Sequence, residues 1–253
     1  MDSYLVASIV FACVFLGSLV GLCLNSFLPE HHRSQASHDA IKLGTGMLSV
    51  LASLVLGLLI ASIKSSFDTT DSQMRNFATE LILLDQALRD YCPETAQARD
   101  VLRAYTARAI EDQWPRERTT PVQTEDSGAG KALNNAQLAI LALHPETSQQ
   151  RLLRDSALKL FSTVLETRWL LIERSESSIQ PILMFILIAW ITLIFVSFGY
   201  NAPRNATVIT AFFICSVALS ACLFIIVEMD GPFDGLIVVS SHAMRDALAH
   251  MSE

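Results

Sequence analysis

Four long apolar spans, arranged as two pairs around a charged middle, constrain this chain more than any other feature. The spans run from Tyr4 to Phe27, Leu43 to Ile63, Pro181 to Phe198 and Thr207 to Val227, and none contains an Asp, Glu, Lys, Arg or His. A helix that rises about 1.5 Å per residue needs roughly 20 apolar residues to cross the hydrocarbon core of a bilayer. The sequence therefore predicts an integral membrane protein with four spanning helices.

The composition excludes a nucleic acid partner and a disulfide framework. The formal net charge of the 253 residues is −7, and no stripe of basic residues alternates with aromatic ones. All cysteines except Cys92 lie within the spans, and we interpret them as small apolar packing residues. The N-terminus lacks the positive region of a signal peptide, so we expect the first span to be retained.

The spans divide the chain into four segments. We expect residues 1–64 to form a first transmembrane hairpin, 65–178 a helical soluble domain, 179–228 a second hairpin, and 229–253 an acidic segment with an amphipathic tail. Apolar residues in the middle segment recur at three- and four-residue steps, which is typical of helices. The predicted fold is an all-α membrane protein in which two transmembrane hairpins flank a helical soluble domain.

The second span is predicted to continue into the soluble segment as one helix. No Gly or Pro interrupts the sequence after it until Pro93, so we expect a rod from near Gly44 to Tyr91. Its soluble half carries an apolar stripe formed by Met74, Phe77, Leu81, Leu84, Leu88 and Tyr91.

Basic residues near the spans suggest an orientation. An even number of spans places both termini and the middle segment on one side of the membrane. That side carries more basic residues near the membrane than the other: Lys64, Arg75, Arg168, Arg174 and Arg245 against Arg33, Lys42 and Arg204. The positive-inside rule then favours a cytoplasmic middle segment and cytoplasmic termini.

The soluble segment contains no recognisable enzyme motif. It has no Gly-rich phosphate loop, no nucleophile elbow and no Cys or His cluster with metal-ligand spacing. A metal site could be formed in the loop after the first span by His31, His32 and His38 with Glu30 and Asp39, but a short polar loop is the simpler interpretation. We predict no enzymatic activity, no cofactor and no bound metal.

Small residues recur at four-residue spacing in the first two spans. Gly17 and Gly21 form such a pair, and a longer ladder in the second span is formed by Ser49, Ser53, Gly57 and Ala61. Small side chains let membrane helices approach closely, so helix packing is the simplest interpretation. The alternative is that this helix faces a pore lined by Ser49, Ser53, Leu56 and Ile60, with the serine hydroxyls offered to a permeating ion.

An apolar row and an acidic segment are further candidates. Leu59, Ile63 and Phe67 are four residues apart, and in an oligomer such a row would form stacked apolar rings able to gate a pore by dewetting. In a monomer the row would be an ordinary core stripe. After the last span, three carboxylates could attract ions or simply form a solvated helix end: Glu228, Asp230 and Asp234.

Several motifs together resemble one family. They are the runs 28–32 (LPEHH), 54–61 (LVLGLLIA), 64–68 (KSSFD), 202–208 (APRNATV), 228–237 (EMDGPFDGLI) and 245–248 (RDAL). As a set they are similar to the bacterial bestrophin-like membrane proteins, across nearly the whole chain. The resemblance implies a pentameric channel with a pore lined by the second helix, an apolar neck, and an acidic segment containing Pro232 and Phe233. The fuller acidic cluster of calcium-gated animal bestrophins is absent, so calcium control is not implied.

The leading hypothesis is a homo-oligomeric ion channel, expected as a homopentamer in a bacterial inner membrane, with inorganic ions and lipid as its partners. Carboxylates repeated around a pore mouth would favour cations slightly. The alternative is a non-conducting membrane scaffold or sensor whose helical domain binds a cytosolic partner. A secondary transporter is disfavoured because the spans contain no Asp, Glu, Lys, Arg or His for a proton or substrate relay.

Overall fold

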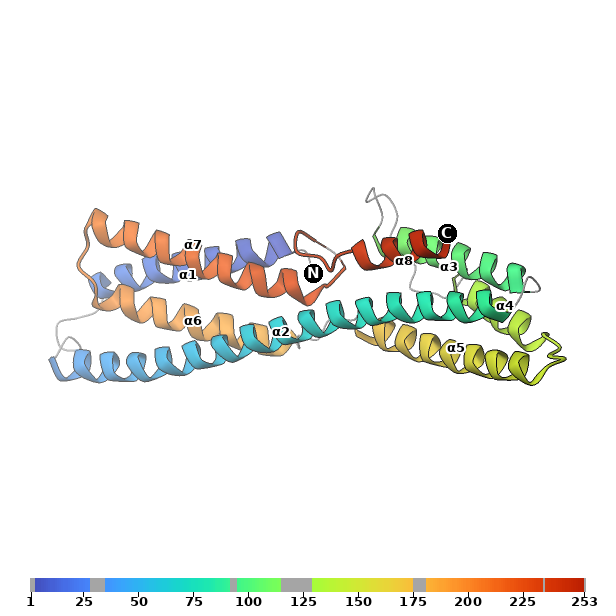
Figure 1. The fold of residues 1–253 in the computed structure, drawn as a ribbon. Coiled ribbons are helices and arrows are strands. Elements are labelled where there is room, and N and C mark those ends of the chain that lie inside the picture. Colours follow the sequence, from blue (N-terminus) through green and yellow to red (C-terminus); the bar gives the residue numbers. More distant parts are fainter. Residues whose placement is uncertain are drawn as a thin grey trace. The chain divides into compact units, whose positions relative to one another are not determined.

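The structure is a computed structural model that describes residues 3–27, 35–91, 95–114, 129–174, 181–233 and 235–252. These residues form eight helices and no strand, which confirms the predicted all-α class. Figure 1 shows them as α1 (Ser3–Phe27), α2 (Gln35–Tyr91), α3 (Ala96–Gln113), α4 (Ala129–Leu141), α5 (Ser148–Arg174), α6 (Pro181–Asn201), α7 (Ala206–Asp230) and α8 (His242–Ser252).

Four of these helices, α1, α2, α6 and α7, are long and apolar enough to cross a membrane. The chain is therefore a multi-pass membrane protein. The prediction that the second span continues into the soluble segment is confirmed, because α2 is one helix of 57 residues and begins nine positions before Gly44.

The chain divides into two compact units. One contains residues 1–67 and 177–237, and the other contains residues 68–176 and 238–253. The chain crosses from one unit to the other three times: within α2, between α5 and α6, and between α7 and α8.

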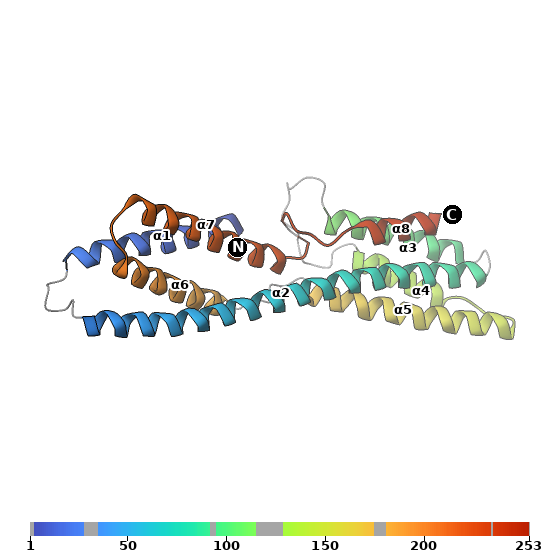
Figure 2. The same cartoon turned by 60° about the vertical axis from the view of Figure 1, so that its left-hand side comes forward.

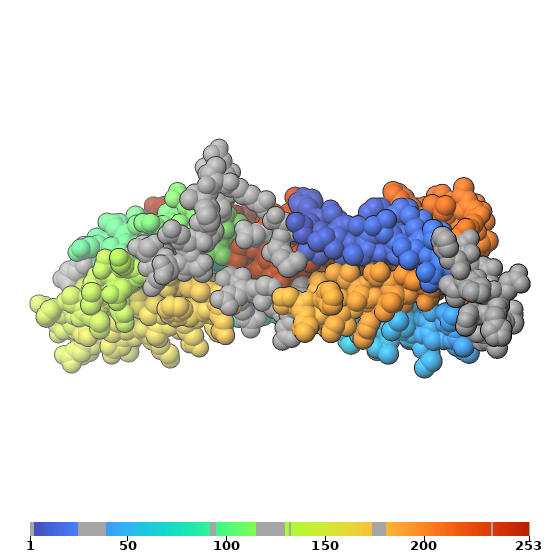
Figure 3. Space-filling view, turned by 180° about the vertical axis from the view of Figure 1, so that it is seen from behind, coloured from blue at the N-terminus to red at the C-terminus, as the bar shows by residue number. Residues whose placement is uncertain are grey.

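In the first unit, α1 packs against both α6 and α7 (Figures 1 and 2). Figure 3 shows α1 and α6 side by side on one face. The apolar core of this unit is built from all four membrane helices, and its most buried members include Val10 and Val14 of α1, Leu187 of α6 and Leu223 of α7.

The crossing of α1 and α6 depends on glycine. A Cβ at Gly21 would lie 2.1 Å from the carbonyl oxygen of Val196, and a Cβ at Gly199 would lie 2.1 Å from that of Ser18. Both distances are far shorter than any van der Waals contact, so only glycine allows the two backbones to approach this closely. The interpretation of Gly17 and Gly21 as packing residues is confirmed.

The turn between α6 and α7 is fixed at both sides. Asn205 caps α7, as its Oδ1 accepts a hydrogen bond of 2.8 Å from the backbone N–H of Val208. Arg204 donates from Nε and a terminal nitrogen to the carbonyl oxygen of Leu22, at 3.1 and 2.7 Å, and also to that of Cys23. Because α1 continues to Phe27, these two carbonyls lie inside the helix, and the guanidinium is a second donor to oxygens that have two lone pairs each.

The second unit is a bundle of α3, α4, α5 and α8 with the last part of α2. All six residues of the predicted apolar stripe on α2 are buried in it. Helix α3 packs against α4 and α8, and α4 packs against α5. The short helix α8 buries one face, formed by Met244, Ala247 and Met251.

Candidate functional site

The residues of the predicted neck do not share one environment. Leu59 and Ile63 have exposed fractions of 8% and 4%, and both belong to the apolar core that the first unit forms from its own helices. Phe67 is half-buried, with the Lys64 ammonium 5.7 Å from its ring centroid. The neck stays a prediction, but this burial favours another side of α2 for any pore.

The predicted pore-lining residues lie on the flank of that buried face. Ser49 and Leu56 are half-buried, whereas Ser53 and Ile60 are exposed, Ile60 to 42%. The hydroxyl of Ser49 donates to the carbonyl oxygen of Thr45, and that of Ser53 to the carbonyl oxygen of Ser49, each at 2.8 Å. The serine oxygens keep their acceptor lone pairs, while their protons are already used by the helix.

Helix α2 leaves more apolar surface open than the other membrane helices. Each helix contains an apolar stretch of 18 residues. The buried share of this stretch is 11% in α2, compared with 22% to 39% in α1, α6 and α7. The exposed side of α2 includes Gly46 and Gly57, where an added Cβ would meet no atom within 4 Å. In the single chain, α2 therefore has an unpartnered face with room for a close neighbour.

The acidic segment is organised around Glu228. This carboxylate has an exposed fraction of 3%, and its Oε1 accepts a hydrogen bond from the backbone N–H of Leu236. Gly235, whose φ is +107°, lies so close that an added Cβ would overlap the Glu228 carboxylate. Glu228 thus fixes the backbone at Leu236, in the segment that follows its own helix. Its burial argues against a role in attracting ions. Asp230 is half-buried, and Asp234 lies outside the described residues.

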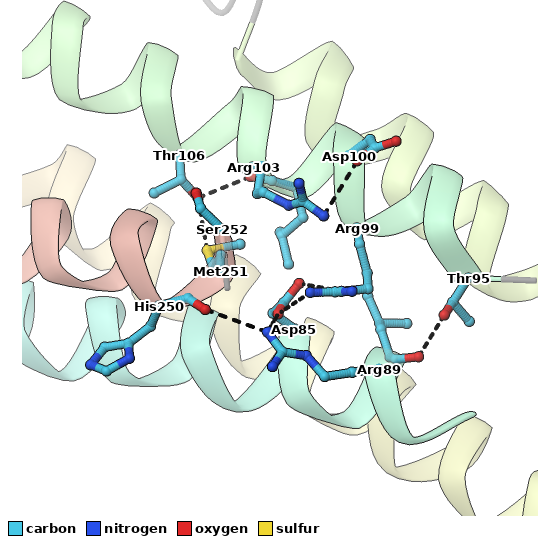
Figure 4. A network of polar contacts seen from close by, with 12 residues as sticks. Asp85, Arg89, Thr95, Arg99, Asp100, Arg103, Thr106, His250, Met251 and Ser252 are labelled. Atoms are coloured by element: carbon cyan, nitrogen blue, oxygen red, sulfur yellow. Dashed lines mark hydrogen bonds and ion pairs between the residues drawn. The ribbon is translucent and has the colours of Figure 1, made fainter. Parts of the chain in front are cut away.

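A buried carboxylate in the second unit was not anticipated from the sequence. Asp85 of α2 has an exposed fraction of 2%, and Arg99 of α3 donates to both of its oxygens, from Nε at 2.8 Å and from a terminal nitrogen at 3.0 Å (Figure 4). The bidentate geometry is the strong form of an arginine–carboxylate pair. The hydrogen bond with Asp85 also raises the pKa of Arg99.

The same carboxylate reaches the C-terminal helix through a second arginine. Arg89, one turn after Asp85 on α2, donates to Asp85 Oδ2 at 3.3 Å and to the carbonyl oxygen of His250 in α8 at 3.4 Å (Figure 4). Thr106 of α3 contacts the sulfur of Met251 at 3.8 Å. Asp85 therefore links α2 directly to α3 and, through Arg89, to the sequence-distant α8.

Over the part of the chain that the structure describes, no group of three His, Cys, Asp or Glu side chains could hold a metal ion. Of the loop considered as a metal site, Glu30, His31 and His32 lie outside the described residues, as does the side chain of His38.

A sequence profile of the bestrophin-like domain matches residues 12–244, which is most of the chain. The chain belongs to the bestrophin-like family. No curated protein sequence matches it closely enough to count as a relative.

Solved structures give the same fold for this bestrophin-like chain. Crystal structures of two point mutants of a bacterial bestrophin homologue from Klebsiella pneumoniae both superpose with a TM-score of 0.67, at 15% and 14% sequence identity. The first alignment covers 98% of this chain and 99% of the homologue, and the second covers 100% and 99%. At such low identity the likeness shows the fold.

Burial raises the pKa of two side chains in the second unit of the bestrophin-like chain, Tyr105 and Glu80. Burial raises the pKa of the Tyr105 phenol to about 12, although the nearby Arg168 guanidinium opposes the change. Burial also raises the pKa of Glu80, against a hydrogen bond of 3.1 Å that its Oε1 accepts from Thr167 of α5. The neighbouring carboxylate of Glu166 raises it further.

We predict that Glu80→Gln makes the second unit more stable at neutral pH. A carboxyl whose pKa is raised by folding stabilises the folded state below its unfolded pKa, and this contribution is lost as the pH rises through the folded pKa. The variant, which carries no charge there, should lose that part of the pH dependence. Thermal unfolding between about pH 4 and pH 8 measures the effect. Glu173→Gln, an exposed change on α5, is the control and should leave the profile unaltered.

Proposed function

We propose that this bestrophin-like chain is one subunit of a homo-oligomeric ion channel in which α2 faces the central axis. The observation that carries the proposal is the open apolar face of α2, the least buried of the four membrane helices. A helix with this much unpartnered surface is completed either by lipid or by copies of itself. Glycines at Gly46 and Gly57 favour a helical neighbour, because small residues promote close helix packing in membranes.

The side of α2 that carries Ser53 and Ile60 is the better candidate for contact with ions. Leu59 and Ile63 are buried in the core of their own subunit, whereas Ser53 and Ile60 are exposed. Ile60 would then supply an apolar constriction, and Ser53 an oxygen about two helical turns further along the path.

The ion path is proposed to favour cations. Because the hydroxyl protons of Ser49 and Ser53 are donated to backbone carbonyls, the oxygens retain only acceptor lone pairs, which suits a cation better than an anion. Of the acidic segment, Asp230 is the described carboxylate that keeps some exposure, and repeated around an axis it would concentrate cations. A pentamer in a bacterial inner membrane, with the second unit in the cytoplasm, completes the proposal.

Flux measurements with two isoleucine variants test it. The purified chain in liposomes should pass cations. The variant Ile60→Ala should raise the flux several-fold, because it widens an apolar constriction. Ile63→Ala is the matched control three residues away. It should lower stability by about 2 kcal/mol or more by removing a core side chain, and leave the flux per oligomer unchanged.

Other outcomes would change the proposal in different ways. An increase in flux with Ile63→Ala alone would restore the neck first predicted at Leu59, Ile63 and Phe67. Tight vesicles for every variant, together with a monomeric or dimeric mass in detergent, would overturn the channel and favour the scaffold hypothesis.

A further inference from the structure

The C-terminal helix α8 depends on its neighbours for its structure. It has 11 residues, and a helix of this length is only marginally stable in water by itself. Its buried face is limited to Met244, Ala247 and Met251, while most of its other side chains are exposed. A small docking surface of this kind makes α8 a low-stability part of its unit, able to detach without unfolding the rest.

One arginine fastens the end of this helix. Arg89 is held by Asp85, whose other contacts come from Arg99, so the buried carboxylate orients both guanidinium groups (Figure 4). From that position Arg89 donates to the carbonyl oxygen of His250, among the last carbonyls of α8. Cations stabilise helix C-terminal ends, because unpaired carbonyls accumulate negative partial charge there.

The segment before α8 is fixed at two points. Glu228, near the end of α7, accepts a hydrogen bond from the backbone N–H of Leu236. Trp114, just after α3, donates from Nε1 to the carbonyl oxygen of Val239 at 2.8 Å, and Val239 is buried. Leu236 is therefore held to α7 and Val239 to the end of α3, and two residues of the chain lie between these two points.

We propose that α8 is a detachable latch, fastened by Arg89, whose release alters ion flow through its short connection to α7. The effect on ion flow rests on the proposed channel function. The attachment of α8 by Arg89 does not depend on it. A docked latch holds the stretch 231–241 in place, and a released one lets that stretch move with the end of α7.

Hydrogen exchange tests the fastening in the full chain, reconstituted in nanodiscs. Arg89→Gln should speed amide exchange in residues 242–252 by about tenfold, the factor expected for losing one hydrogen bond to a charged group. Arg75→Gln is the matched control, because Arg75 forms an exposed pair with Asp71 on the same helix at the same spacing. It should leave exchange in α8 unchanged. Equal exchange in both variants would overturn the proposal.

A second variant and a second measurement separate the two parts. Met251→Ala removes a buried contact of α8 without touching the arginines, and should also speed exchange in residues 242–252. Both variants should change cation flux into liposomes in the same direction. Faster exchange with unaltered flux in a conducting protein would overturn the coupling to α7. If the unmodified chain does not conduct, the channel proposal fails, and the exchange result still decides whether α8 is a latch.

Discussion

Gly21→Ala is expected to lower the stability of the membrane unit by about 2 kcal/mol or more, the scale of overpacking in a tight core. The new methyl group would lie 2.1 Å from the carbonyl oxygen of Val196, an atom of the α6 backbone that cannot move aside like a side chain. Helices α1 and α6 would have to separate along their crossing. Thermal unfolding in detergent should show a melting temperature lower by roughly 4–8 °C.

Gly44→Ala is the matched control, since it makes the same chemical change in a membrane helix. An added Cβ at Gly44 meets no atom within 4 Å, and alanine favours helix by up to about 1 kcal/mol. Its melting temperature should stay the same or rise in the monomer. Equal losses in the two variants would contradict the close crossing of α1 and α6.

Asp85→Asn is expected to destabilise the second unit by about 3 kcal/mol, as removing one partner of a buried ion pair commonly does. The amide would present N–H groups to an arginine that can only donate, so Arg99 would lose one of its two acceptors and its counter-charge. Chemical unfolding followed by helical circular dichroism measures the loss.

Asp71→Asn tests whether burial is the cause. Asp71 also pairs with an arginine one turn later, at 2.6 Å, but the Arg75 side chain is 69% exposed. Exposed pairs contribute at most about 1 kcal/mol, so this variant should cost far less. A similar loss in both variants would mean that the buried network is not what stabilises the unit.

The soluble half of α2 could be predicted from the sequence because one side of it faces water. Alternation of apolar and polar residues at helical spacing identified the stripe from Met74 to Tyr91, and every member is buried. Asp85 interrupts that stripe between Leu84 and Leu88, which was the available signal for a buried carboxylate. Its partner Arg99 lies beyond the proline that ends the helix, and no local pattern connects the two.

The number and extent of the membrane helices could be predicted from the sequence, but the side of each helix that is buried could not. Helices α6 and α7 are apolar on every side, so no periodicity distinguishes a buried face from one that meets lipid. Of the row Leu59, Ile63 and Phe67, the first two lie in the core and the third is half-buried, and four-residue spacing does not say what such a row meets. Similarly, three nearby carboxylates gave no sign that the loop after α7 returns a backbone N–H to Glu228.

The hydrogen bonds between Arg204 and α1 have a consequence for biogenesis. Arg204 follows Leu22 by 182 residues, which a ribosome takes about 10–40 s to add. Throughout that interval α1 is made but lacks both the hydrogen bonds from Arg204 and the α6 backbone that fits against Gly21. Lipid and interfacial water must serve as its temporary partners, and the last loop to be synthesised between membrane helices is the one that completes the first.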